Sequence, residues 1–138
     1  MRVNGDSPLI DPTVIDYAVA LFRQHQPDLV SNVLRRTFPK GQSVEVIAVS
    51  ALSRAVESMT TAAEREHVTT WFYANPSSVH TVSFENAPPR VDLQLSVDSP
   101  EDLLRVEAIL ARLGEPSGGH GLEAIIAAAD SIEPPRAI

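Results

Sequence analysis

The stretch that most constrains the fold is residues 4–12, because it leads from a β-prone start through a turn into a helix. Gly5 allows backbone angles that other residues avoid, so the chain can turn there. Asp6 would then stand at the carboxyl end of a strand, where open α/β sheets bind their ligands. Asp11 is a good N-cap and Pro12 a good first helical residue, and together they predict a helix that begins at residue 12.

The rest of the sequence alternates between strand and helix patterns and predicts an α/β fold on a mainly parallel sheet. A second carboxylate, Asp98, ends a predicted strand and precedes a capping-box pattern at Ser99 and Asp102. Because the carboxyl ends of parallel strands meet at one edge of a sheet, we expect Asp98 to lie near Asp6. In the alternative interpretation Asp98 only assists the helix start. The predicted strands are residues 28–34, 44–49, 80–84 and 91–97, and the predicted helices are residues 12–25, 51–59, 62–74, 100–113 and 122–132.

The composition describes a single domain whose 138 residues, 43% of them hydrophobic, can bury a sizeable core. Eleven Lys and Arg residues face 18 Asp and Glu residues, and the net charge of -7 disfavours nonspecific binding to nucleic acid or to an anionic membrane. The absence of cysteine excludes a disulfide framework and a thiolate metal site. No apolar run is long enough for a signal peptide or a membrane span, so we expect a cytoplasmic location.

The turn itself reads Gly-Asp-Ser-Pro-Leu-Ile-Asp-Pro over residues 5–12, and it resembles the Gly-Asp-x-Pro-Leu-Ile-Asp-Pro segment of one group of cytidylyltransferases. This group is the spore coat polysaccharide biosynthesis protein F-like branch, of the same type as the CMP-sugar-acid synthetases. The resemblance runs from Met1 to about Leu113 and corresponds to the C-terminal half of such an enzyme. Further matches follow in the same order at residues 31–32, 36–41, 44–46, 64–69 and 97–103.

The resemblance implies a three-layer αβα, Rossmann-like nucleotide-diphospho-sugar transferase fold, truncated at the N-terminus. Residues 1–114 would form the C-terminal half of the cytidylyltransferase-like domain, and residues 115–138 a Gly/Pro linker with a short tail helix. The implied activity is Mg²⁺-dependent transfer of a cytidylyl group from CTP to a sugar or sugar acid for surface polysaccharide biosynthesis. The sequence lacks the glycine-rich loop that cradles the triphosphate in such enzymes, so we expect an acceptor-binding half that is inactive alone.

The resemblance also assigns residues to the site. Asp6 and Asp98 would be the catalytic pair that holds Mg²⁺, since hard oxygen ligands suit this ion. Arg36 would bind the carboxylate or phosphate of the sugar, for which a planar guanidinium is well shaped. Each assignment has a plainer alternative. The basic loop around Arg36 would only be solvated, Arg65 and His67 would belong to a salt-bridged helix start, and Glu45 would be a strand residue that faces water. The substrate-binding residues expected on this basis are Asn32, Arg36, Glu45, Arg65 and His67.

Two other classes of function remain open on the sequence alone. One is a non-enzymatic interaction module, and the other is a remnant that binds a sugar acid without catalysis. In both cases the strand that runs into Gly5 and Asp6 would have unpaired backbone groups on one side, which favours the addition of another strand. We therefore expect a homodimer or a complex with a partner chain, and no binding to nucleic acid or membrane.

Overall fold

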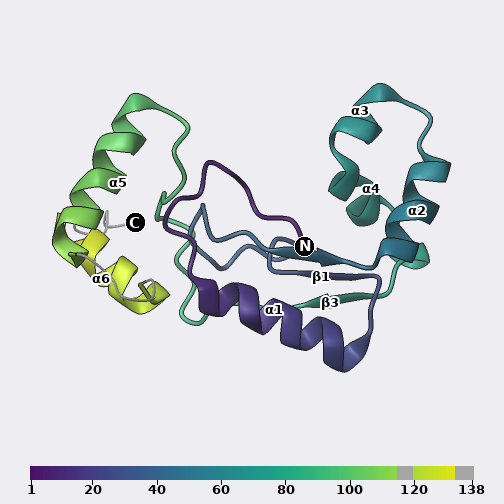
Figure 1. The fold of residues 1–138 in the computed structure, drawn as a ribbon, viewed down its shortest axis with the longest axis horizontal. Coiled ribbons are helices and arrows are strands. Elements are labelled where there is room, and N and C mark those ends of the chain that lie inside the picture. Colours follow the sequence, from purple (N-terminus) through teal and green to yellow (C-terminus); the bar gives the residue numbers. More distant parts are fainter. Residues whose placement is uncertain (115–119, 133–138) are drawn as a thin grey trace.

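The computed structural model describes residues 1–114 and 120–132, and the linker expected from residue 115 lies mostly outside this part. The described part of the chain consists of short strands and longer helices (Figure 1), the mixed α/β content that the sequence pattern predicts. The strands are β1 (Leu29–Ser31), β2 (Glu45–Ile47) and β3 (Thr81–Ser83). The helices are α1 (Pro12–His25), α2 (Val49–Ser58), α3 (Ala62–Glu66), α4 (Val68–Ala74), α5 (Pro100–Leu113) and α6 (Leu122–Ile132), with a 3₁₀ turn η1 (Pro76–Ser78).

The sheet is mixed, with the strand order β2-β1-β3. Val30 of β1 lies opposite Val46 in the antiparallel pair with β2 and opposite Val82 in the parallel pair with β3. The expectation of a mainly parallel sheet is therefore wrong for one of these two pairings. The reason is the connection, because the chain returns directly from β1 to the antiparallel β2 through a loop without a helix. The parallel strands β1 and β3 are instead connected through β2 and the helices α2, α3 and α4.

Helices cover both faces of this sheet. Val30 packs in a cluster with Val14 and Ala18 of α1, while its neighbour Leu29 packs in another cluster with Phe72 of α4. This alternation follows from the strand period of two, which points successive side chains to opposite faces. Figure 1 shows α1 running along one side of the strands and α2, α3 and α4 grouped at one end.

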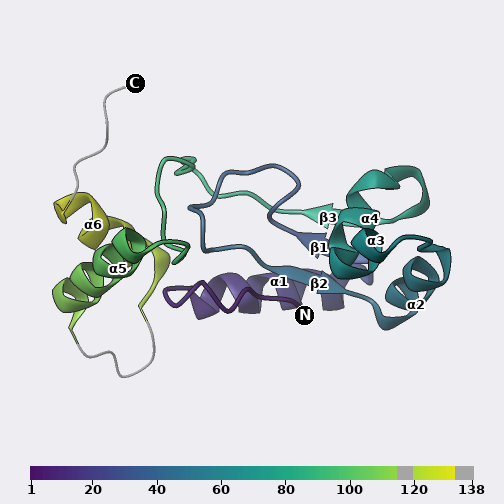
Figure 2. The same cartoon turned by 90° about the horizontal axis from the view of Figure 1, so that it is seen from above.

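The helices α5 and α6 form a separate cluster at the other end of the molecule, as the two views agree (Figures 1 and 2). Leu95, Ile109 and Ile125 are the most buried members of this cluster. The bounds of both helices are as predicted, including the capping box of Ser99 and Asp102 at the start of α5. The expected tail helix is therefore part of the packed structure.

The predicted strand over residues 91–97 is wrong. Within this segment Gln94 forms an isolated parallel bridge with Lys40, and no strand is formed. The alternating apolar residues Leu93, Leu95 and Val97 instead pack in the cluster with α5 and α6. The alternation of apolar residues indicates that one side of the segment is buried, and such burial does not require pairing with another strand. Asp98 consequently follows an irregular segment and does not end a strand.

Two further local expectations are corrected. The start of the chain forms one antiparallel bridge, between Arg2 and Glu45, so the strand expected before the turn is reduced to a single pair. The helix expected over residues 62–74 is divided at His67, whose φ of -112° and ψ of 58° leave the helical region. Across the described residues, 1–114 and 120–132, no helix is both long and apolar enough to cross a bilayer.

Candidate functional site

The predicted acceptor residues Arg36 and Glu45 lie in one hollow, with a volume of about 330 Å³. Its walls come from the first residues of the chain, the loop after β1, the strand β2 and the helix α4. Hydroxyl groups and guanidinium groups dominate the lining, which suits a ligand with many hydroxyls and a negative charge. The lining residues are Arg2, Asn4, Val33, Arg36, Ser43, Glu45, Thr69, Thr70 and Tyr73.

Glu45 forms the buried floor of this hollow, with 5% of its side chain exposed. Its carboxylate accepts a hydrogen bond from Arg2 Nη1 at 2.8 Å and another from the hydroxyl of Tyr73. Arg2 also donates to Thr69 Oγ1 at 3.0 Å, and the Tyr73 hydroxyl lies 2.8 Å from Ser31 Oγ. A buried carboxylate is stable only when it is paired in this way.

The same contacts fix the protonation of Tyr73. Burial raises the pKa of its phenol well above the ordinary value, and the hydrogen bond to Glu45 raises that pKa further. Tyr73 therefore keeps its proton at neutral pH and donates a hydrogen bond to the Glu45 carboxylate. The floor of the hollow is a preformed hydrogen-bonded network rather than a reactive base.

Arg36 is the available cation of the hollow. It is exposed, and within the part of the chain that the structure describes its guanidinium makes no hydrogen bond or ion pair. Arg2, by contrast, is held by Glu45 and Thr69. A guanidinium without a partner, next to hydroxyl groups, is suited to the bidentate binding of a carboxylate or phosphate.

The other three predicted substrate-binding residues lie outside this hollow. Asn32 is buried, and its amide donates to the carbonyl of Gln42 at 2.7 Å and accepts from the N–H of Val44 at 2.8 Å, so it closes the loop between β1 and β2. Arg65 donates to the carbonyl of Met59 at 3.3 Å. His67 is exposed at the junction of α3 and α4 and lines a separate, mainly apolar hollow.

The segments that carry Asp6 and Asp98 lie side by side. The carbonyl of Asp6 accepts a hydrogen bond from the N–H of Val97 at 2.8 Å. The Asp6 carboxylate is exposed and accepts from Ser7 Oγ at 2.9 Å through Oδ1. Its Oδ2 makes no hydrogen bond within the described residues. The two candidate metal ligands therefore come from neighbouring backbone segments, although no strand carries either of them.

Asp98 is held by donors on one oxygen. Its Oδ2 accepts from Lys40 Nζ at 2.8 Å, from Gln94 Nε2 at 2.7 Å and from Ser96 Oγ at 3.1 Å. The hydrogen bond from Lys40 is the main reason that the pKa of Asp98 lies below its ordinary value. Oδ1 makes no hydrogen bond in the described part of the chain. Two exposed carboxylates, each with a free oxygen, are the type of ligand that suits Mg²⁺, which commonly takes one or two carboxylates and completes its shell with water and substrate oxygens.

Arg2, Thr69 and Tyr73 belong to the hollow but were missed by sequence reasoning. Each reaches Glu45 or Arg2 from a distant part of the chain, and Arg2 and Glu45 are separated by 43 positions. The one local signal is the carboxylate of Glu45 in an apolar strand, since a buried charge requires partners. That signal predicts that partners exist but does not identify them.

Comparisons with known proteins establish the fold. No family model matches the chain. The chain is similar to the solved structure of a cytidylyltransferase from Leptospira borgpetersenii serovar Hardjo-bovis, with a TM-score of 0.86 and 24% identity, over 93% of this chain and 54% of that one. It is also 31% identical over 106 residues to an uncharacterized protein of Methanocaldococcus jannaschii, which covers 74% of this chain and 42% of that protein. The chain thus has the fold of a cytidylyltransferase and spans about half the length of the proteins it matches.

Proposed function

We propose that the chain is the acceptor-binding part of a nucleotidyltransferase that moves a cytidylyl group from CTP to a sugar or sugar acid. The observation that carries this proposal is the likeness in fold to a cytidylyltransferase over 93% of the chain. The polar hollow adds chemical support, because it offers the guanidinium of Arg36 beside hydroxyl groups and the fixed carboxylate of Glu45. The specific relatives would be the spore coat polysaccharide and CMP-sugar-acid enzymes, with a role in surface polysaccharide biosynthesis and a cytoplasmic location.

In this proposal Arg36 binds the carboxylate of the sugar acid, and the network of Arg2, Glu45 and Tyr73 orients its hydroxyls. The Glu45 carboxylate can accept from a sugar hydroxyl, and the Thr69 and Tyr73 hydroxyls frame the space around it. These residues position the acceptor. Asn32 holds the loop that carries Arg36, so it would act through the loop conformation. Arg65 and His67 would contribute at the outer side of α3 and α4.

Asp6 and Asp98 would hold Mg²⁺, which when bound supplies charge neutralisation for the triphosphate. Lys40 already offsets part of the negative charge of Asp98, so a bound metal ion has to compete with Lys40 for this carboxylate. We expect Asp6→Asn and Asp98→Asn each to weaken Mn²⁺ binding, measured by the loss of the free Mn²⁺ signal in electron paramagnetic resonance. Equal Mn²⁺ binding by the unmodified chain and by both variants would remove the metal assignment.

The complete architecture in this proposal is the three-layer, Rossmann-like sheet, of which β1, β2 and β3 form a part. The polypeptide of residues 1–138 tested alone is expected to bind the acceptor but not to turn over CTP, because it carries no glycine-rich phosphate loop. A pyrophosphate-release assay with CTP, Mg²⁺ and a panel of sugar acids tests this expectation. Clear turnover would show that some segment of this chain holds the triphosphate.

We also propose that the chain associates with a second copy or with a partner chain. The first six residues are exposed. Besides the bridge of Arg2 with β2, the carbonyls of Asn4 and Asp6 are hydrogen-bonded, and the other backbone groups of this segment can pair with another strand. Sedimentation velocity over a concentration series tests this proposal. A single monomeric species at every concentration would contradict it.

A further inference from the structure

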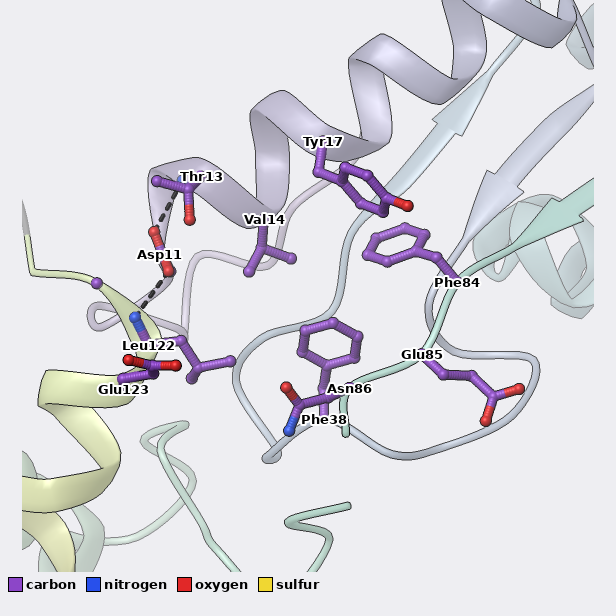
Figure 3. A pocket seen from close by; sticks show the side chains of 11 residues that line it. Asp11, Thr13, Val14, Tyr17, Phe38, Phe84, Glu85, Asn86, Leu122 and Glu123 are labelled. Atoms are coloured by element: carbon purple, nitrogen blue, oxygen red, sulfur yellow. Dashed lines mark hydrogen bonds between the residues drawn. The ribbon is translucent and has the colours of Figure 1, made fainter. Parts of the chain in front are cut away.

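A second hollow, which shares no lining residue with the candidate acceptor site, lies where α1 and α6 begin. It has a volume of about 430 Å³ and is lined by the first turns of both helices, by the loop after β1 and by the residues that follow β3. Figure 3 shows the side chains that surround it. Neither the nucleotidyl-transfer proposal nor the metal assignment uses any of these side chains, so the hollow needs its own explanation.

Three aromatic rings form one wall of this hollow. Phe84 contacts Tyr17 with a centroid distance of 5.3 Å and Phe38 with a centroid distance of 5.6 Å, and both contacts are edge-to-face. Figure 3 shows the rings following one another from α1 towards the loop after β1. Phe84 is buried, whereas Tyr17 is 54% exposed. The rings that a ligand can reach are therefore those of Tyr17 and Phe38, which a buried ring holds in place.

The charged side chains that line the hollow are carboxylates. Among the described residues its lining contains Asp11, Glu85 and Glu123 and no Lys, Arg or His residue. Asp11 is occupied by two backbone N–H groups, and Glu85 forms an ion pair with Arg35 at 3.4 Å. Glu123 is exposed and makes no hydrogen bond or ion pair within residues 1–114 and 120–132. One carboxylate without a partner among the described residues thus belongs to the same lining as the aromatic wall.

This combination selects one class of ligand. An anion would be repelled by Glu123 and Glu85, and a neutral apolar ligand would have to cover the Glu123 carboxylate without pairing it. A bare metal ion is not favoured either, because Asp11 and Glu85 already have partners and the Glu123 carboxylate alone would supply few of its ligands. An organic cation suits this lining, because its charge is attracted both by the carboxylate and by the faces of the aromatic rings.

We propose that the hollow between α1 and α6 is a binding site for a small organic cation, an alkylammonium or guanidinium compound. Its charged group lies between Glu123 and the rings of Tyr17 and Phe38, and its apolar stem covers Val14 and Leu122. Within the described residues the Oδ1 of Asn86 makes no hydrogen bond, while its Nδ2 donates to the carbonyl of Pro88 at 2.9 Å, so this oxygen can accept from the ligand. The volume is within the range of small-molecule sites, so the hollow can hold a whole compound of this kind.

The test is a nuclear magnetic resonance titration of the full chain with choline and with agmatine, observing the ring signals of Tyr17 and Phe38. The matched ligand control is 3,3-dimethyl-1-butanol, which has the shape of choline without the charge. We expect saturable shifts with both cations, and binding of the neutral alcohol that is about tenfold weaker or more. Equal shifts with the alcohol would overturn the proposal, because the hollow would then be a merely apolar surface.

Two variants test the residues. Glu123→Gln and Phe38→Leu should each weaken cation binding by about threefold or more, because each removes one of the two attractive groups. Glu107→Gln, on the exposed side of α5, removes the same charge far from the hollow and should leave the affinity unchanged. If Phe38→Leu does not fold, Glu123→Gln still decides the matter. An equal loss in Glu107→Gln would show attraction to the net charge of the chain alone and would overturn the site.

Discussion

The carboxylate of Asp11 joins two helices, and replacing it should affect the end of the molecule formed by α5 and α6. Asp11 is 3% exposed. Its Oδ1 accepts from the N–H of Thr13 in α1 and its Oδ2 from the N–H of Leu122 in α6, each at 2.7 Å. Its own N–H donates to Gln42 Oε1 at 2.9 Å. The N-cap pattern of the sequence predicts the first contact, and the second is visible only in the fold.

The expected cost follows from these contacts. Asp11→Ala removes the cap of α1, worth ~1 kcal/mol, and leaves the buried N–H of Leu122 without an acceptor, worth ~2 kcal/mol. We therefore expect the free energy of unfolding to fall by ~3 kcal/mol, which corresponds to ~10 °C in Tm for a chain of this length. Asp11→Asn keeps one oxygen acceptor and should lose about half as much.

The assay is urea unfolding followed by circular dichroism, with hydrogen exchange of the α6 amides as a local readout. Asp16→Ala is the control, because Asp16 is exposed on the same helix and makes no hydrogen bond or ion pair in the described residues. That variant should stay within ~0.5 kcal/mol of the unmodified chain. Equal stability of the two alanine variants, with unchanged exchange in α6, would refute the reasoning.

Two further predictions concern the backbone and acid stability. Gly41→Ala should lower the free energy of unfolding in urea by more than ~2 kcal/mol. The backbone φ of Gly41 is +99°, and the new Cβ would lie 2.7 Å from the carbonyl carbon of Leu95. A loss below ~0.5 kcal/mol would contradict this prediction. The backbone N–H of His80, and with it the guanidinium of Arg54, holds the pKa of Asp28 below its ordinary value of 3.8. The stability from this depressed pKa is present above that value and is lost as the pH falls through the folded-state pKa. The advantage over Asp28→Asn in urea unfolding should therefore be full at pH ~6 and shrink as the pH falls below 3.8, and an advantage that does not shrink would contradict this.

Local chemistry explains which parts of the fold could be predicted. The cap residues Asp11 and Ser99 act within their own helix starts, so α1 and α5 begin where the sequence indicates. The strand expected over residues 91–97 needed a partner strand, and the sequence shows alternation but not pairing. The break at His67 has no local signal of the Gly or Pro kind, so the sequence pattern does not indicate it.

The candidate site was predictable to the same extent. Arg36 and Glu45 were assigned because their segments resemble those of the cytidylyltransferases, and in the structure both line the polar hollow. Arg2 and Tyr73 carry no such signal, since their roles come from contacts across 43 and 28 positions. Asn32 was assigned to the substrate, and the structure shows that both ends of its amide are engaged with the loop.

The central claim is that Arg36 makes this hollow a site for an acidic sugar, and a binding titration tests it most directly. Isothermal titration calorimetry with a sugar acid and with its neutral parent sugar should give binding of the acid alone. Arg36→Gln should weaken that binding by about tenfold or more, because a charge-assisted bidentate pair is lost. Arg23→Gln, at an exposed position on α1, is the matched control and should bind as the unmodified chain does. Equal affinity for the acid and the neutral sugar, or an Arg36→Gln variant that binds the acid as well as the control, would contradict the account.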